Sequence, residues 1–351
     1  GEGMRTSIIP SDTLHESSFR IDASYHSSDG MNVIRNFLRS VNNNTLIRLD
    51  KLGDVSNMFV GDWLKRIYVE DPEHGAPYIS GDNILKMDPL AGCKYLSFRH
   101  GGYIQQLSLQ ERMILMSCSG TIGRILYVNS SLAGTVGSPD LLRIQAKLGM
   151  ILPGYLYAFL SSGLGTAFIQ KGVYGAVIQH IEIPYMATIP IPRLDPGQEE
   201  EIHRLIEQAA ELRVRAASSI QVARNLVEKE VGFSSYSKKN DHAFSVEEAT
   251  LDVSSPFRLD SFYYSGYCAE ALRTLDKYPG IIMSAKDVGY RIYNPPLFKR
   301  QFAESGFPYM SGVDFYNMRP KTDRFLSKNQ PDVDLYLVRK GTVLVQSAGQ
   351  R

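Results

Sequence analysis

Short apolar runs and longer helical patterns follow one another irregularly along the first half of the chain. Helical spacing predicts helices at residues 154–161 and 163–170, whereas prolines punctuate residues 181–192 and predict an extended segment there. Apolar runs bounded by polar or turn residues predict β-strands at residues 94–98, 113–116, 125–128 and 141–144. Because strands and helices do not alternate regularly, this mixture predicts the α+β fold class.

The clearest helix in the sequence is predicted for residues 196–231. Asp195 supplies an N-cap oxygen, Pro196 suits the first helical position, and Gln198 stands at the capping-box position. Glutamates at 199–201 place negative charge at the positive end of the helix dipole, and Gly232 provides a stop. About 36 residues at ~1.5 Å each give a rod of roughly 54 Å, which is too long for an ordinary globular helix.

This helix carries a narrow apolar seam with steps of three and four residues. Its members are Ile202, Leu205, Ala209, Leu212, Ala216, Ser219, Ala223 and Leu226. Such a pattern over nearly four heptads predicts a coiled-coil-type helix, and the small residues in its middle permit close approach of a partner helix. The alternative is a helix that packs on its own domain.

Three segments of the first half return in the same order in the second half. Residues 19–25, 77–81 and 114–120 resemble residues 257–263, 308–312 and 343–349. The separations fall from 238 to 231 to 229 residues, as expected for one fold repeated with slightly shorter loops. We therefore predict a duplicated globular domain, with the first copy at residues 1–195, a spacer helix at 196–231 and the second copy at 232–351.

Composition and charge restrict the class of protein. Among 351 residues, 43% are hydrophobic and 21% charged, so the chain can bury a core. A net charge of +1 excludes a uniformly basic, histone-like protein but allows a local basic face. Three cysteines without a CxxC pair indicate free thiols in a reducing cytoplasm. No apolar run is long enough to span a bilayer, the N-terminal residues lack the apolar region of a signal peptide, and Gly1-Glu2-Gly3 before Met4 is typical of a cloning remnant.

Two motifs suggest chemistry that their surroundings do not support. Asn294-Pro295-Pro296-Leu297 is similar to the loop that holds the target amine in amino-methyltransferases, but Leu297 replaces the aromatic ring that stacks on the base. Ser117-Cys118-Ser119-Gly120 suggests a nucleophile on a tight turn, yet no base can be assigned to it. The histidines are scattered, so neither a catalytic centre nor a metal site is expected.

Three motifs in sequence order resemble those of a known family. They are Pro77-Tyr78-Ile79-Ser80-Gly81-Asp82-Asn83-Ile84, residues 114–124 with Ser119-Gly120-Thr121-Ile122-Gly123-Arg124, and Pro153-Gly154-Tyr155-Leu156-Tyr157-Ala158-Phe159-Leu160. Together they resemble the target-recognition domain of type I restriction–modification specificity subunits. Ile189-Pro190-Ile191-Pro192, Gln198 and the long helix resemble that family's junction between domain and spacer.

The resemblance implies a subunit without catalytic activity. Two target-recognition domains would each read one half of a split sequence in double-stranded DNA, held apart by an antiparallel pair of spacer helices. Modification subunits would bind the spacer, carry S-adenosylmethionine and methylate adenine, and restriction and motor subunits would join for cleavage. No cofactor or metal is expected on this chain, and no membrane is expected as a partner.

The sequence departs from the family in its second copy, which ends at Arg351 just after the echo of the Ser-Gly segment. Measured against the first copy, roughly 110 residues and a second spacer helix are missing, through a shortened gene or cleavage after arginine. We therefore expect incomplete assembly with partners, and a homodimer in which two long helices pair antiparallel.

The DNA-contacting residues are predicted from basic pairs and glycine-flanked loops. Lys65-Arg66 and Lys299-Arg300 both precede a Pro-Tyr-x-Ser-Gly segment, and matched basic pairs suit matched DNA backbones. Backbone amides and side chains of Ser119, Thr121 and Arg124 form a glycine-rich candidate for phosphate binding, with an ordinary hairpin as the alternative. The loop with Lys171, Tyr174, Gln179 and His180 is the candidate for base or backbone reading, with a buried hairpin as the alternative.

Two other functions remain open at this point. One is a DNA adenine methyltransferase that uses Asn294-Pro295-Pro296, and the other is a coiled-coil scaffold that binds protein rather than DNA. The near-zero net charge favours the scaffold slightly, because DNA-binding proteins usually carry a basic stripe.

Overall fold

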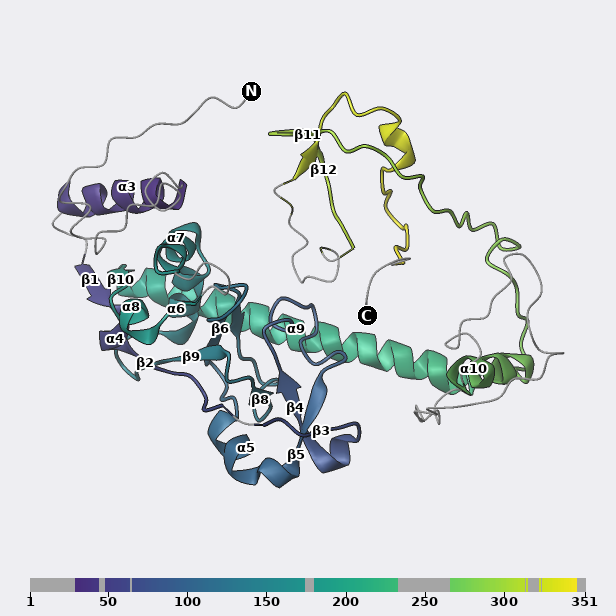
Figure 1. Ribbon diagram of the computed structural model, residues 1–351, viewed down its shortest axis with the longest axis horizontal. Helices are drawn as coiled ribbons and strands as arrows, with labels where there is room; N and C mark the ends of the chain where they lie inside the picture. The colour runs from purple at the N-terminus through teal and green to yellow at the C-terminus, as the bar shows by residue number, and fades with distance from the viewer. Residues whose placement is uncertain are drawn as a thin grey trace. The chain divides into compact units, whose positions relative to one another are not determined.

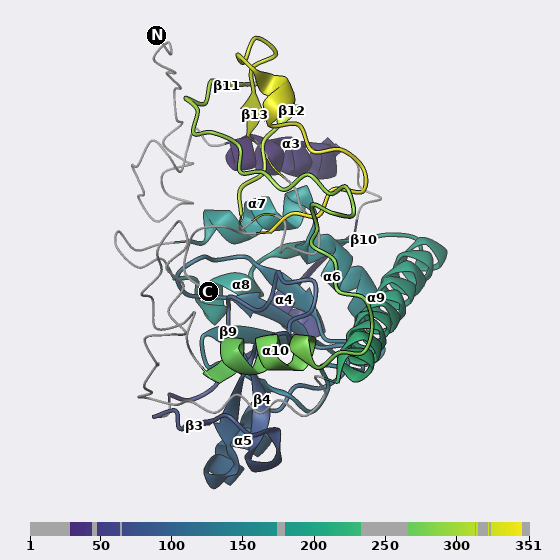
Figure 2. The ribbon, with the colours of Figure 1, turned by 90° about the vertical axis from the view of Figure 1, so that its right-hand side faces the viewer.

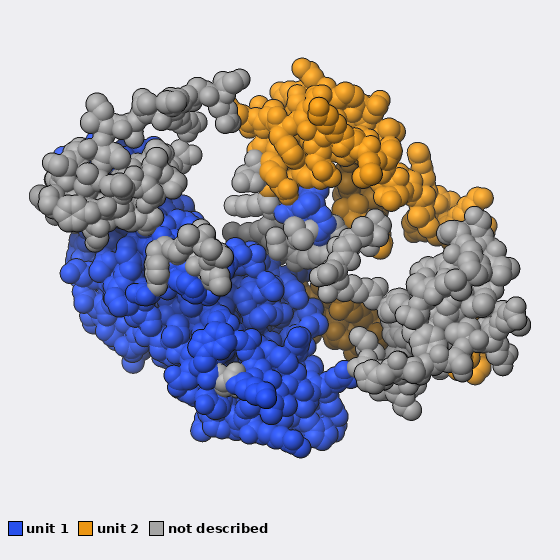
Figure 3. All heavy atoms as spheres, viewed as in Figure 1, with its two compact units in different colours: residues 1–215, 310–321 blue, residues 216–309, 322–351 orange. Residues whose placement is uncertain are grey.

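The structure is a computed structural model and describes residues 29–43, 48–63, 65–173, 180–232, 266–312, 314, 322 and 324–345. It divides into two compact units, Gly1–Arg215 with Met310–Lys321 and Ala216–Tyr309 with Thr322–Arg351 (Figure 3). Both contain strands and helices, so the α+β fold class is confirmed. In the described part of the chain, no helix is both long and apolar enough to cross a membrane.

The first unit is built on two four-stranded sheets (Figure 1). One has the order β2-β9-β6-β7, with all pairs antiparallel. The other has the order β3-β5-β4-β8, in which only β4 and β8 run parallel. A short ribbon pairs β1 with β10. The strands are β1 (Arg48–Lys51), β2 (Ser56–Phe59), β3 (Tyr68–Val69), β4 (Gly75–Ile79), β5 (Lys94–Ser97), β6 (Ile114–Ser117), β7 (Ile125–Tyr127), β8 (Val136–Gly137), β9 (Leu141–Ala146) and β10 (Pro190–Arg193).

Strand β6 is buried on both faces, because side chains alternate across a strand. Ile114 and Met116 enter the core on the helical side, whereas Met113 and Leu115 enter a second core on the opposite face. Such two-sided burial explains why residues 113–116 form a continuous apolar run rather than an alternating pattern. All four strands predicted from apolar runs are confirmed within two residues at each end.

The helices of the first unit are short. The predicted helices at residues 154–161 and 163–170 are confirmed as α6 and α7, but the extended prediction for residues 181–192 is wrong in part, because α8 forms a helical turn before β10 begins. Its first turn contains Pro184, a position where proline favours helix. The elements are α3 (Asp29–Asn43), α4 (Leu52–Val55), α5 (Gly101–Leu107), α6 (Pro153–Leu160), α7 (Gly163–Lys171), α8 (Ile183–Ala187) and the 3-10 turns η1 (Pro72–His74) and η2 (Phe98–His100).

Helices cover the two sheets differently. Helix α3 packs on α7 (Figure 2). The rings of Phe37 and Phe168 meet edge to face there, with 6.1 Å between their centroids. Helix α5 lies at the end of the other sheet, where Leu107 is fully buried with Leu96 of β5 and Val136 of β8. The core on one face of the β6 sheet therefore includes α6 and α7, whereas α5 contributes to the small core of the β4 sheet.

The long helix α9 (Pro196–Val231) has the predicted bounds. The carboxylate of Asp195 accepts the backbone N–H of Gly197 at 2.9 Å, as expected of an N-cap. Glu199, rather than Gln198, reaches back and accepts the N–H of Leu194 at 2.9 Å. At the other end, Gly232 has φ +76°, the left-handed conformation in which glycine commonly ends a helix.

The second unit contains a three-stranded sheet with the order β11-β13-β12. Its elements are α10 (Gly266–Asp276), β11 (Phe302–Ala303), β12 (Phe307–Pro308), β13 (Phe325–Leu326) and the 3-10 turn η5 (Val333–Leu335). This sheet repeats the order β3-β5-β4 of the first unit. Two rows of aligned residues match: Tyr68, Leu96 and Ala76 with Phe302, Leu326 and Phe307, and Val69, Tyr95 and Pro77 with Ala303, Phe325 and Pro308.

Hydrogen bonds outside the strands repeat as well. The N–H of Ser97 donates to the carbonyl of Ile67 at 2.9 Å, and that of Ser327 donates to Gln301 at 2.7 Å. The N–H of Ile67 donates to His100 Nε2 at 3.2 Å, and that of Gln301 donates to Gln330 Oε1 at 2.9 Å.

The turn after the Pro-Tyr segment also has one form in both copies. The hydroxyl of Ser80 donates to Asn83 Oδ1 at 2.7 Å, and that of Ser311 donates to Asp314 Oδ2 at 2.6 Å. The repeated segments 77–81 and 308–312 thus have the same local structure, whereas the repeat of 19–25 and 257–263 lies outside the described residues.

The third repeated segment does not repeat in structure. Leu115 of β6 is fully buried, whereas its counterpart Leu344 is 48% exposed and lies in coil. In the first unit β6 gains its burial from β7 and β9, which both follow it along the chain. The described residues of the second unit contain no strand equivalent to β7 or β9, and within them the segment 343–345 is unpaired coil.

Candidate nucleic-acid interface

Arg66 lies among aromatic side chains at the start of β3. Its guanidinium lies 5.5 Å from the ring centroid of Trp63 and 5.9 Å from that of Tyr78, which β4 supplies. One guanidinium nitrogen lies 3.7 Å from the Asp140 carboxylate. Burial lowers the pKa of Arg66, but Tyr68, Tyr78 and Asp140 outweigh this effect and raise it, so the side chain stays charged. Its neighbour Lys65 is exposed.

The segment 117–124 forms the hairpin that joins β6 to β7, which was one of the two alternatives for its glycine-rich sequence. Gly120 has φ +74°, a conformation that disfavours residues with a side chain. The hydroxyl of Ser117 donates to the carbonyl of Thr121 at 2.6 Å and accepts the N–H of Arg124 at 3.0 Å. Arg124 reaches back to Gly81 O at 3.4 Å and to the carboxylate of Asp82 at 3.5 Å. The Ser-Gly hairpin therefore contacts the turn after the Pro-Tyr strand.

The third predicted loop also meets this hairpin. Ser119 and His180 form an isolated antiparallel bridge, and the N–H of Ile181 donates to the carbonyl of Cys118 at 3.2 Å. His180 is exposed, while Lys171 ends α7 and is half-buried. Tyr174 and Gln179, the predicted aromatic and base-reading residues of the loop, lie outside the described residues.

Asp140 connects these parts. Its carboxylate faces Arg66, and its carbonyl accepts the N–H and Sγ–H of Cys118 at 3.3 and 3.1 Å. The hydroxyl of Ser138 donates to the same carboxylate at 3.1 Å. Through Asp140, the basic pair and the Ser-Gly hairpin belong to one continuous region of the first unit. The predicted residues that meet there are Arg66, Ser119, Thr121, Arg124 and His180.

A buried arginine supports this region from behind. Arg143 of β9 is fully buried, and its guanidinium donates to the carbonyls of Gly137 at 2.7 Å and Leu141 at 2.9 Å. These two residues flank Asp140 in sequence. Burial lowers the pKa of Arg143 to about 10, which still leaves the group charged at neutral pH. Arg143 therefore fixes the loop that presents Asp140.

Sequence reasoning missed Trp63, Asp140 and Arg143. Trp63 carried a signal, since it is the single tryptophan of the chain and precedes Arg66 by three residues. It is also 76% exposed, unusual for so large an apolar side chain. Asp140 and Arg143 carried none, because only the pairing of β9 with β6 brings them to this place.

The second unit repeats the aromatic surroundings of the arginine. The guanidinium of Arg300 lies 5.8 Å from the ring of Phe298 and 5.4 Å from that of Tyr309. In both copies a further ring meets the tyrosine edge to face at 5.6 Å, Tyr68 in the first and Phe302 in the second. Lys299, like Lys65, is exposed. Among the described residues Arg300 has no carboxylate partner, which is the main difference from Arg66.

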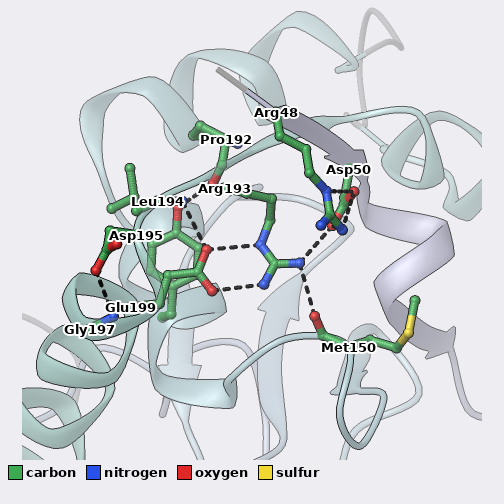
Figure 4. A network of polar contacts seen from close by, with 10 residues as sticks. Arg48, Asp50, Met150, Pro192, Arg193, Leu194, Asp195, Gly197 and Glu199 are labelled. Carbon is green, nitrogen blue, oxygen red and sulfur yellow. Dashed lines mark hydrogen bonds and ion pairs between the residues drawn. The ribbon is translucent and has the colours of Figure 1, made fainter. Parts of the chain in front are cut away.

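A second polar network joins β10 to α9 (Figure 4). Arg193 donates twice to Glu199, at 2.8 Å each, and once to Asp50 of β1. It also donates to the carbonyl of Met150 at 2.9 Å. A cavity of about 600 Å³ is lined by Arg48, Met150, Arg193 and Glu199 among others. The contacts of Arg193 hold the first turn of α9 against β10 and β1.

Further along α9, Glu207 connects the helix to the first unit. Its carboxylate accepts a hydrogen bond from the Tyr127 hydroxyl and forms an ion pair with Arg112 at 3.2 Å. Ala210 is buried, and Ile202 and Ile206 pack against the same core. One face of the first half of the helix therefore packs on its own domain, the alternative considered for the seam.

Most of the predicted seam lies on another face. Leu205, Leu212 and Leu226 are 50%, 60% and 63% exposed. Ala216, Ser219 and Ala223 are also exposed, whereas Ile202 and Ala209 are half-buried. Whether a partner helix covers this surface stays a prediction.

The motifs that suggested chemistry have no catalytic surroundings in the described residues. Burial raises the pKa of the Cys118 thiol, so it is less nucleophilic than an exposed cysteine. Leu297, after Asn294-Pro295-Pro296, is fully exposed in coil. No group of three or more His, Cys, Asp or Glu side chains within the described ranges could hold a metal ion.

Comparison with known proteins gives matches in structure alone. No family model and no curated protein matches the sequence. A type I restriction–modification S subunit from M. genitalium matches 54% of this chain and 46% of its own length, with 18% identity and a TM-score of 0.38. The HsdS subunit from Thermoanaerobacter tengcongensis matches 59% and 49%, with 15% identity and a TM-score of 0.33. The type IIG restriction endonuclease BpuSI matches 56% and 30%, with 10% identity and a TM-score of 0.37.

These matches extend over about half of the chain, and the chain spans about half or less of each solved structure. Two of the three are S subunits of the kind that the sequence motifs resemble. A TM-score below 0.5 is too low to support a function, so any function must be argued from the residues of this chain.

Proposed function

We propose that this chain is a non-catalytic DNA-recognition subunit of a type I restriction–modification complex. Each of its two copies would read one half of a split target in double-stranded DNA. One observation supports this above all: two sheets that share the order and register of three strands each hold an arginine near the tyrosine of a Pro-Tyr segment. Two equivalent arginine-bearing surfaces in one chain suit the two halves of a split target.

The long helix supports the same proposal. It is anchored to the first copy by Arg193 and Glu207, and its bounds leave no break before Gly232. Such a helix would act as a spacer and as the docking surface for modification subunits. Those partners would carry S-adenosylmethionine and methylate adenine, and restriction and motor subunits would bind the same assembly.

Selection from a pool of random duplexes tests DNA recognition. The full chain is incubated with the pool at fixed salt, and bound molecules are sequenced after several rounds. We expect a motif with two defined segments separated by unspecified base pairs, because two copies read independently. Binding that is equal for all duplexes, or absent, would contradict sequence-specific recognition.

A coiled-coil scaffold that binds protein alone is the second candidate function. The exposed leucines of α9 favour it, because isolated soluble proteins rarely leave such a stripe uncovered. The same selection separates the two functions, since a scaffold enriches no DNA motif.

A further inference from the structure

The two copies hold Arg66 and Arg300 in the same way, and this geometry restricts what the arginines can contact. Each guanidinium lies within 6 Å of two ring centroids, Trp63 and Tyr78 for one and Phe298 and Tyr309 for the other. Contacts of this kind limit rotation of a long side chain, and a hydrogen bond with Tyr68 also holds Arg66. The remaining N–H groups on the planar edge of the guanidinium are the donor surface. In the first copy 28% of the side chain remains exposed.

The donor edge of Arg66 has an acceptor beside it. Asp140 Oδ2 lies 3.7 Å from a guanidinium nitrogen, beyond an optimal hydrogen bond, and its side chain is 37% exposed. The loop that carries it is fixed by Arg143 and Ser138. The N–H donors of Arg66 and the carboxylate acceptors of Asp140 thus lie side by side, and both side chains are partly exposed.

A phosphate group suits this pair poorly. The Asp140 carboxylate would repel a phosphate that approaches Arg66, since like charges at such distances oppose each other. A neutral base edge meets no such repulsion. In the major groove, guanine presents two acceptors, O6 and N7, which match a bidentate arginine, and its paired cytosine presents the N4 amino donor, which a carboxylate accepts.

We propose that Arg66 and Asp140 together read one G·C base pair, with Arg66 on guanine and Asp140 on the paired cytosine. This inference rests on the proposed function, because it names the contact that the first copy makes with DNA. Arg300 is the counterpart in the second half of the target. It reads guanine without the accompanying carboxylate, since no acidic side chain among the described residues pairs with it.

Lys65 provides a matched contrast in the same turn. It is adjacent to Arg66 and exposed, and the described residues give it no ion pair or cation–π contact. A lysine ammonium is a compact point charge on a flexible stem. A contact of that kind suits a phosphate and contributes no sequence preference.

The test uses the selected duplex and a set of duplexes that differ from it at one base pair each. Binding of the wild-type chain, Arg66→Lys, Asp140→Asn and Lys65→Ala is measured across a range of salt concentrations. We expect Arg66→Lys to lose about 5- to 150-fold of discrimination at one G·C pair in the first segment, with the rest of the motif intact. Asp140→Asn should weaken preference at the same base pair, while Lys65→Ala should preserve the motif and reduce the salt slope by about one.

The outcomes separate this inference from the proposed function. If Arg66→Lys keeps the full preference at that base pair, Arg66 does not read a base, and the inference is overturned while DNA recognition stands. If Asp140→Asn strengthens binding to all duplexes equally, the carboxylate only repels DNA, and base reading by it is overturned. If the wild-type chain selects no motif, both fail. Thermal unfolding checks each variant, and Arg300→Lys, which should affect the second segment alone, replaces any variant that does not fold.

Discussion

The sheet of β3, β5 and β4 and the sheet of β11, β13 and β12 have the same register but very different burial. In the first copy, Tyr78 and Leu96 are buried under Leu107 and Val136, which α5 and β8 supply. In the second copy Leu326 is buried as Leu96 is, but Tyr309, the counterpart of Tyr78, is only half-buried. Phe302 is 53% exposed where Tyr68 is 37% exposed. The difference shows that a register of this kind depends on local signals, whereas a core depends on segments that are distant in sequence.

Those local signals are visible in the residues. Proline, tyrosine and a Ser-Gly turn occur in both copies, and both turns close with a side-chain acceptor three residues after the serine. The hydrogen bond that His100 accepts in one copy is accepted by Gln330 in the other. The N–H groups of Ile67 and Gln301 stand at equivalent positions, and each is hydrogen-bonded, as backbone donors in folded proteins generally are. Different side chains provide the acceptor in the two copies.

The largest expected effect comes from one substitution made in both copies. Leu115→Ala removes a fully buried side chain between β9 and β7 and should lower the free energy of unfolding by about 2–5 kcal/mol. Leu344→Ala at the equivalent position, which is 48% exposed, should cost less than about 0.5 kcal/mol. Urea unfolding of the two variants measures both. Equal losses would mean that the second copy has a core of its own around residues 343–345.

The copies also differ in how predictable they were. The strands of the first copy could be predicted from apolar runs. Strands β6 and β9 are buried on both faces, so apolar residues stand next to one another in them instead of alternating strictly with polar residues. The long helix follows from its cap, its charges and Gly232. The turn α8 was missed, since Ile189-Pro190-Ile191-Pro192 dominated the pattern of that segment.

The candidate site was predictable only in part. Arg66 and Arg300 follow from the repeat, and the structure gives both the same aromatic neighbours. Asp140 could not be found, since a carboxylate 74 residues after Arg66 has no local pattern that links the two. Contacts between strands of different sheets depend on tertiary packing, which periodicity does not encode.

The helix between the copies gives a second way to sharpen the comparison. Its first half packs on the first copy, but Leu212 and Leu226 of the predicted seam are exposed. If two chains pair through this seam, Leu212→Asp places an unpaired charge in it and should weaken association by about 2–3 kcal/mol, or roughly a hundredfold.

Sedimentation of the wild-type chain and the variant at tens of micromolar measures this effect. Val222→Asp is the matched control, because Val222 is 55% exposed on the same helix but lies outside the seam. A wild-type monomer, or equal effects of the two aspartates, would contradict dimerisation through the seam.

The smallest expected effect concerns the junction of β1, β10 and α9 around Arg193, which is described in the first copy alone. Burial raises the pKa of Asp50, but hydrogen bonds from Arg193 and Arg48 outweigh it and hold the pKa below its ordinary value. A carboxyl group with a lowered pKa in the folded state stabilises the protein above the unfolded-state pKa of about 4, and that stability is lost as the pH falls through the lower folded-state value.

We therefore expect the first copy to lose about 0.5–1 kcal/mol below pH 4 through this group, the range for a partly exposed ion pair. Asp50→Asn should remove that part of the pH dependence and lower stability by the same amount at pH 7. Asp54→Asn, four residues later and exposed, serves as the control. Urea unfolding at several pH values decides the matter. If the Asp50→Asn profile parallels that of the wild type, the network around Arg193 keeps α9 in place without help from Asp50, and Glu199 alone carries the junction.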